Sequence, residues 1–192
     1  MSRHPRRALT SILVVGCVGL VAGAGTFAAF SATSSNAGNT FAAGTVELSD
    51  NDAGTSLYGV TNRVPGNSVT TCIRVTYSGS LAAGVKLYSQ SSVDTVDQYL
   101  DLTVEKGSMP AGTPFPNCTG FGSESTIFSG TLNGFKSSNV SYASGIAANP
   151  GSQTSWNQSD TLVYRFTVTL QNTLAAQGLT STTAFTWEAR NQ

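Results

Sequence analysis

The most informative absence in this chain of 192 residues is histidine, which occurs once, at position 4. Charged residues make up only 10% of the sequence, well below the roughly 25% typical of soluble domains. Because His4 lies in a segment that we expect to be removed, the mature chain has no histidine for a catalytic triad or a zinc site. The shortage of charge also excludes a coiled coil and the basic face of a protein that binds nucleic acid.

Sequence motifs of common enzymes are missing as well. The chain has no HExxH, GxSxG, P-loop or CxxC motif, so we expect no enzyme activity, no catalytic or metal-binding residue and no cofactor. Hydroxyl side chains are abundant instead, with 50 Ser and Thr residues beside 40% hydrophobic residues. This composition can form the core of one domain and is typical of exported β-rich proteins.

The N-terminus has the layout of a secretory signal peptide. Arg3, Arg6 and Arg7 form a basic segment, and a short apolar stretch over residues 11–24 and several small residues follow it. An uncleaved signal would be the only membrane attachment that the sequence suggests, because the apolar stretch is about long enough to span a bilayer.

We expect the signal to be cleaved between Ala28 and Ala29, which leaves small residues at the −1 and −3 positions. Cleavage after Ala24 would satisfy the same rule. The mature chain would be secreted, either to the extracellular space or to the cell surface. It would carry seven basic and ten acidic residues, so its charge gives it no reason to bind nucleic acid.

The cysteine count also favours export. Cys17 leaves with the signal, whereas Cys72 and Cys118 remain. An even number of cysteines in an exported chain predicts a disulfide, here one that closes a loop of about 45 residues and contributes about 3–4 kcal/mol. Two buried free thiols are the alternative.

Alternation of apolar and polar residues predicts an all-β fold. In residues 161–170, Leu162, Tyr164 and Phe166 share one face, and Arg165 lies on the other. Such runs, separated by turn residues, are typical of an antiparallel sandwich. We expect a jelly-roll-like β-sandwich over residues 39–192, with one or two short helical turns. Residues 172–178 form one such turn in this prediction, residues 137–159 form a long surface loop, and the other strands are 45–48, 69–77, 85–88, 99–104, 125–132 and 184–189.

Two acidic segments invite a comparison with cation sites. Asp50, Asn51 and Asp52 precede Gly54 as in a calcium loop, but the spacing of an EF-hand is not met. A solvated β-turn is therefore the better interpretation, and weak calcium binding stays open. The second segment, which predicts an exposed acidic surface, contains Asp94, Asp97, Asp101 and Glu105.

Several segments resemble the TasA/camelysin family. Residues 25–31, GTFAAFS, resemble the family's signal junction, and residues 40–48, TFAAGTVEL, resemble its first strand. Residues 64–69 resemble a Pro-Gly segment of the family, and residues 164–168 and 185–189 resemble its last two strands.

The resemblance implies a secreted jelly-roll protein, processed by a SipW-type signal peptidase, that associates with itself into fibres of an extracellular or biofilm matrix. In such fibres the N-terminal arm of one subunit completes a sheet of its neighbour, head to tail. Here that arm is residues 29–38, with Phe30 as its single large apolar residue. A monomeric secreted or cell-surface binding module and a camelysin-like metallo-endopeptidase are the alternatives. The first arm residues are Ala29, Phe30, Ser31, Ala32 and Thr33.

Overall fold

Two antiparallel sheets form the fold of this protein in a computed structural model that describes residues 44–57 and 64–192. One sheet has the strand order β1-β2-β7-β4-β5, and the other has the order β6-β3-β8. The strands are β1 (Leu48–Asp50), β2 (Ser68–Tyr77), β3 (Ala83–Tyr88), β4 (Leu100–Ser108), β5 (Gly122–Thr131), β6 (Ile146–Ala147), β7 (Thr161–Leu170) and β8 (Thr186–Asn191). The helical segments are η1 (Thr95–Tyr99), α2 (Leu132–Ser138) and η2 (Leu174–Ala176).

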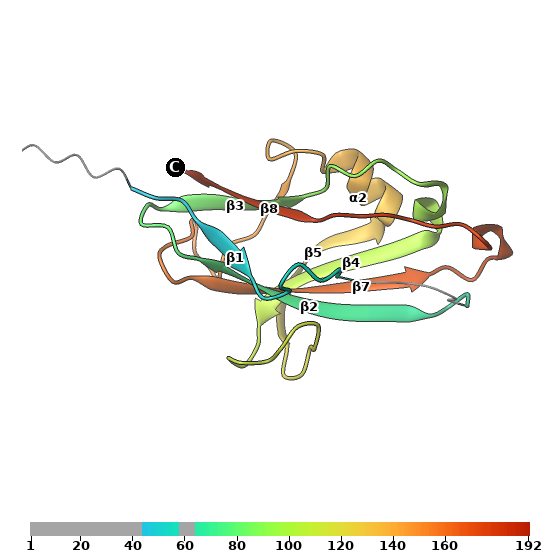
Figure 1. The fold of residues 1–192 in the computed structure, drawn as a ribbon, viewed down its shortest axis with the longest axis horizontal. Helices are drawn as coiled ribbons and strands as arrows, with labels where there is room; N and C mark the ends of the chain where they lie inside the picture. Colours follow the sequence, from blue (N-terminus) through green and yellow to red (C-terminus); the bar gives the residue numbers. More distant parts are fainter. Residues whose placement is uncertain (1–43, 58–63) are drawn as a thin grey trace, which may run out of the picture. The chain divides into compact units, whose positions relative to one another are not determined.

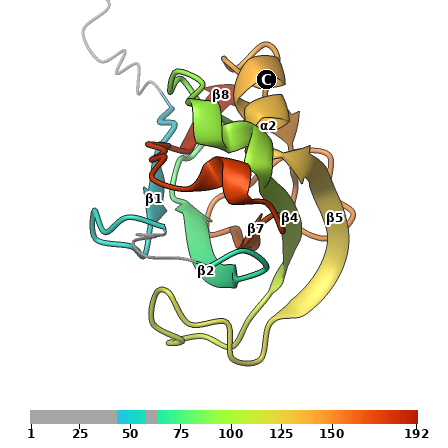
Figure 2. The ribbon, with the colours of Figure 1, turned by 90° about the vertical axis from the view of Figure 1, so that its right-hand side faces the viewer.

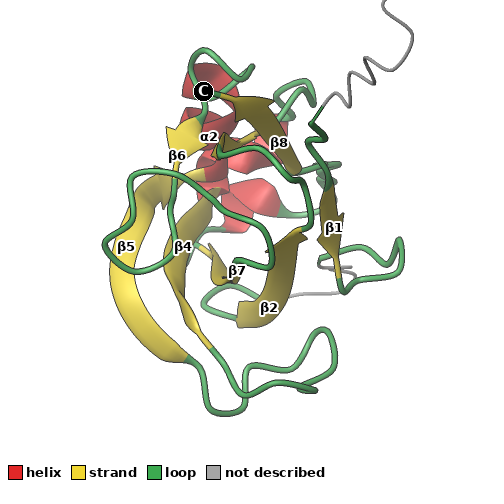
Figure 3. Cartoon of the chain, turned by 90° about the vertical axis from the view of Figure 1, so that its left-hand side faces the viewer, coloured by secondary structure: helices red, strands yellow, loops and turns green. Residues whose placement is uncertain are grey.

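The two sheets face each other, with β3 and β8 over the five-stranded sheet (Figure 1). Figure 2 shows that sheet curving from β1 to β5, with the helical segments at one end of the sandwich. Seen from the other end, β1 and β8 lie on one side and β5 lies on the opposite side (Figure 3). These described residues confirm the prediction of an all-β, sandwich-like fold with short helical turns.

Strand β7 is the centre of the core. It pairs with β2 along one side and with β4 along the other, so that Phe166 lies between Thr71 and Val104. Leu162, Tyr164 and Phe166 are all at most 2% exposed, as their alternation predicts. Burying a large apolar side chain stabilises a fold by about 1.5–3 kcal/mol, so this face of β7 accounts for much of the core's stability.

The first strand differs from its prediction. It was expected over residues 45–48, but β1 begins at Leu48 and extends to Asp50. The preceding residues still contact the neighbouring turn, because Thr45 and Glu47 accept hydrogen bonds from the backbones of Leu81 and Ser78. Their irregular pairing explains why an extended sequence is only partly a strand.

The long surface loop predicted for residues 137–159 is wrong in two ways. Helix α2 ends inside it, and Trp156 within it is fully buried, with its indole N–H donating to the carbonyl of Ala148 at 2.8 Å. The side chain of Thr131 caps α2 by accepting from the N–H of Gly134.

No helix within residues 44–57 and 64–192 is long and apolar enough to cross a membrane. The helical turn expected over residues 172–178 is present as η2.

A disulfide joins Cys72 on β2 to Cys118, with Cα atoms 5.1 Å apart. Cys118 lies in the long loop between β4 and β5, which folds back to β2, where the N–H of Cys72 donates to the carbonyl of Pro116 at 3.1 Å. Arg74 adds to this attachment by donating to the carbonyls of Met109 and Pro110. The loop is thus held by one covalent bond and by hydrogen bonds from β2.

Candidate functional site

A groove of about 1180 Å³ opens between the two sheets on the β1 side of the sandwich. Its floor is the inner face of β1, β2 and β7, where Leu48, Val69 and Leu170 are only partly buried. These residues continue the core into a region where the described residues do not cover them completely. The other apolar floor residues are Val75, Leu100 and Val168.

Residues 176–187 form the wall of the groove. They comprise the last residue of η2, the segment that joins η2 to β8, and the first two residues of β8. Within this wall segment, Phe185 and Trp187 are half-buried and stack on core aromatics. The ring centroids of Phe185 and Phe166 are 4.7 Å apart, and those of Trp187 and Tyr164 are 5.4 Å apart. The wall therefore presents aromatic surface that packs against the core and also lines the groove.

Two edge strands flank the groove. Strand β8 pairs with β3 along one side, and β1 pairs with β2 along one side. In the described part of the chain neither has a second partner, and the two strands approach each other without pairing. An edge strand presents unpaired backbone N–H and C=O groups to any extended segment that comes alongside. An apolar floor beside such an edge has the geometry for adding a strand.

The acidic segment of residues 94–105 does not form the exposed surface that we expected. Asp97 is fully buried, and its charge is compensated by Lys136 on α2, whose Nζ lies 2.8 Å from its Oδ2. Glu105 is partly buried and pairs with Arg165 across β4 and β7. Burial opposes the ionisation of Glu105, but hydrogen bonds from Ser123 and Arg165 lower its pKa overall.

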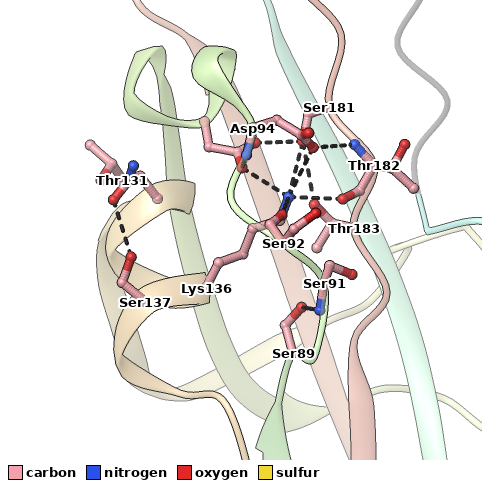
Figure 4. A network of polar contacts seen from close by, with 12 residues as sticks. Ser89, Ser91, Ser92, Asp94, Thr131, Lys136, Ser137, Ser181, Thr182 and Thr183 are labelled. Carbon is pink, nitrogen blue, oxygen red and sulfur yellow. Dashed lines mark hydrogen bonds and ion pairs between the residues drawn. The ribbon is translucent and has the colours of Figure 1, made fainter.

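Asp94 belongs to a polar cluster that also includes the wall (Figure 4), and Asp97 joins it through Lys136 and Ser181. Asp94 accepts the backbone N–H of Thr182 at 2.9 Å and also contacts Lys136. The hydrogen bond from Thr182, together with Lys136, lowers the pKa of the Asp94 carboxyl. Of the four predicted acidic residues, only Asp101 is exposed.

The segment that resembles a calcium loop is a turn held by its own carboxylates. Oδ1 of Asp52 accepts the N–H of Gly54 at 2.7 Å, and Oδ1 of Asp50 accepts the N–H of Asp52. The side chain of Asn51 accepts from the backbone of Arg74. These oxygens already serve the fold, as the interpretation of a β-turn predicts. Gly54 has φ +78°, a conformation that favours glycine.

The signal segment, the Ala28/Ala29 cleavage point and the arm of residues 29–38 lie outside the described residues. Their roles therefore stay predictions. The groove and Lys136 were not predicted from the sequence. Lys136 has helical spacing from Leu132 and Phe135, but α2 has only seven residues, too few for the sequence to indicate a buried helix face.

A model of the family described as camelysin metallo-endopeptidase matches residues 6–103, just over half of the chain. The chain belongs to the camelysin family. The resemblance that the sequence suggested is thereby confirmed at the level of the family. The match includes β1 and β2, which form much of the groove floor, and it ends before the wall segment. No curated protein matches the chain.

The family's description raises the question of a metal site. Among residues 44–57 and 64–192, no group of three or more His, Cys, Asp or Glu side chains is placed to hold a metal ion. The closest acidic cluster, Asp94 with Asp97, already has the ammonium of Lys136 between its carboxylates. Both remaining cysteines are in the disulfide. The described donor groups therefore do not fit a catalytic zinc.

Proposed function

We propose that this camelysin-family chain is a secreted structural subunit that assembles into extracellular fibres. In this proposal, residues 29–38 of one copy add as a strand to the groove of the next copy. The observation that carries the proposal is the groove itself, which has an apolar floor beside the edge strand β8.

The arm has the length and chemistry to fill the groove. Ten extended residues span about 33 Å, more than the length of the six-residue strand β8. Alternate residues of a strand face the same way, so Phe30 and Ala32 would point to the floor while Ser31 and Thr33 would point to solvent. The arm has no charged side chain, so its insertion desolvates no ionised side chain, and the α-amino group of Ala29 lies at its end, where it can remain in solvent. Burial of Phe30 would contribute about 1.5–3 kcal/mol.

The contact is head to tail, because each copy contributes one arm and one groove. Such a heterologous contact propagates into a filament when its rotation does not close a ring. The disulfide supports the secreted location, because disulfides persist in oxidising compartments. Removal of the signal by a SipW-type signal peptidase would release the arm with Ala29 as its first residue.

We also infer that the chain has no peptidase activity of its own. The only histidine is His4, which leaves with the predicted signal. The acidic pair nearest to a metal site is engaged with Lys136. Metal-dependent cleavage of casein by the homogeneous mature protein, abolished by a point substitution in it, would contradict this inference.

The assembly is tested by comparing chains that begin at residue 29 and at residue 39. The shorter chain keeps every described strand and every core residue, so it should fold as a monomer that forms no fibres. Sedimentation and negative-stain electron microscopy measure the difference. Equal fibre formation by both chains would rule out strand addition by the arm as the mechanism of assembly. A longer chain that stays monomeric under all conditions would favour a monomeric binding module.

A matched pair of substitutions tests which face of the arm is buried in the groove. Phe30→Asp should prevent assembly, because a carboxylate in an apolar groove would be desolvated without a partner. Ser31→Asp introduces the same charge on the opposite face of the strand and should assemble nearly as well as the parent. Equal effects of the two substitutions would mean that charge, and not burial of Phe30, controls assembly.

A further inference from the structure

Most of the groove wall is not part of a β-sheet, unlike the groove floor. Between η2 and β8, residues 177–185 belong to no strand, so no ladder of backbone hydrogen bonds holds them. Their side chains are mostly exposed or half-buried. Contacts to neighbouring elements must therefore fix the position of this segment.

Those contacts converge on the segment before and within η1. The N–H of Thr182 donates to Asp94 at 2.9 Å, and the N–H of Ala184 donates to the hydroxyl of Ser91 at 2.8 Å. The hydroxyl of Ser181 donates to Asp97. The wall is thus attached through polar groups of residues 91–97.

Lys136 connects the two sides of this attachment (Figure 4). Its Nζ has no solvent exposure and donates to the carbonyl of Thr182 at 2.8 Å and to Asp97 at 2.8 Å. A buried ammonium must keep its hydrogen-bond partners, because losing them leaves an uncompensated charge. The remaining oxygens within reach of Nζ are the carbonyl of Ser92 at 3.0 Å, Oδ2 of Asp94 at 3.3 Å and Oγ of Ser181 at 3.4 Å.

We infer that Lys136 is a positioning residue for the groove: through Asp97 and Thr182 it holds the wall segment open at the place where a strand would bind. This inference rests on the proposed function. The ion pair is expensive to separate, so the wall keeps its position before the arm arrives. A preformed groove binds more tightly than one that must be ordered on binding.

The inference requires that the effect on binding be separable from the effect on folding. Replacing both partners of a buried ion pair with apolar residues often leaves stability unchanged or raises it. The double variant Lys136→Met/Asp97→Leu should therefore remain folded while it loses the bonds to Thr182 and Ser181, together with the bond that Asp97 accepts from the N–H of Asp94. Lys106→Met is the matched control, because Lys106 also donates to two loop carbonyls, of Asn149 and Gly151, away from the groove.

The experiment uses the chain of residues 39–192 and a synthetic peptide of residues 29–38. Calorimetry measures the dissociation constant, thermal unfolding measures Tm, and hydrogen exchange measures protection of the Thr182 amide. We expect the double variant to bind the peptide at least about tenfold more weakly with Tm near that of the parent, and its Thr182 amide to exchange faster. Lys106→Met should bind as the parent does.

Unchanged affinity in the folded double variant, or an equal loss in Lys106→Met, would overturn the inference. If the double variant does not fold, Ser181→Ala decides, because it removes one bond to Asp97 and leaves the ion pair intact. We expect Ser181→Ala to bind the peptide about two- to fivefold more weakly, and parental affinity would count against the inference.

If the parent itself does not bind the peptide, the proposed function fails. The Thr182 exchange rate then still tests the role of Lys136, and an unchanged rate would contradict it.

Discussion

The inner face of the five-stranded sheet is closed over one half and open over the other. On the β4–β5 side, α2 places Leu132 and Phe135 over the sheet, and both are 0% exposed. On the β1–β2 side, Leu48 and Val69 line the groove and receive no comparable cover from residues 44–57 and 64–192. The same kind of apolar strand face thus serves stability on one side and remains available for binding on the other.

The largest expected effect comes from the closed half. Phe135→Ala should lower the free energy of unfolding by about 3–5 kcal/mol, because its ring packs edge-on against Phe128 and Phe185 at 5.0 and 5.3 Å. Leu48→Ala in the open half should cost less than about 1 kcal/mol, since Leu48 is only partly buried. Urea unfolding of both variants measures the contrast. Equal losses would mean that the groove floor is as well packed as the closed half.

A smaller effect is expected from the outer face. Replacing Cys72 and Cys118 together with Ala should lower the free energy of unfolding by about 3–4 kcal/mol, because the chain without the cross-link gains loop entropy when unfolded. Peptide binding should be unchanged, since no residue of the loop held by this bond lines the groove. Weaker binding of the peptide by the folded variant would show that the two faces are coupled.

The smallest effect is expected from acid. The pKa of Asp94 is lowered in the folded chain by the Thr182 N–H and by Lys136, so its carboxylate stabilises the fold above the usual pKa of about 4. This contribution is lost as pH falls through the lowered pKa. Between about pH 4 and pH 2 the parent should lose more stability than Asp94→Asn, as measured by urea midpoints. Asp101→Asn, in an exposed position on β4, removes one acidic side chain as Asp94→Asn does and is the matched control for the change in net charge.

The strands were predictable because period-two alternation over long runs has few competing explanations. Residues 161–170 and 69–77 became β7 and β2 almost residue for residue. Helix α2 has only seven residues, too few for a helical period to be distinguished from the strand before it. Lys136 on this helix pairs with the buried Asp97. From the sequence alone, Asp97 was expected on an exposed acidic surface.

The groove could not be predicted for a different reason. Its floor and wall come from β1, β2, β7 and the segment before β8, which are distant in the sequence. The wall residues, such as Thr180 and Thr182, are polar and follow no period. Their position depends on hydrogen bonds to residues 91–97 and to Lys136, and such bonds form only in the assembled fold.

The central claim is that the open half accepts the arm, and the two tryptophans of the chain test it directly. Trp187 lines the groove, whereas Trp156 is fully buried elsewhere with its N–H bonded to Ala148. Titration of ¹⁵N-labelled residues 39–192 with the peptide of residues 29–38 should shift the indole signal of Trp187 and leave that of Trp156 in place. Binding that shifts neither signal, or shifts only that of Trp156, would contradict the account.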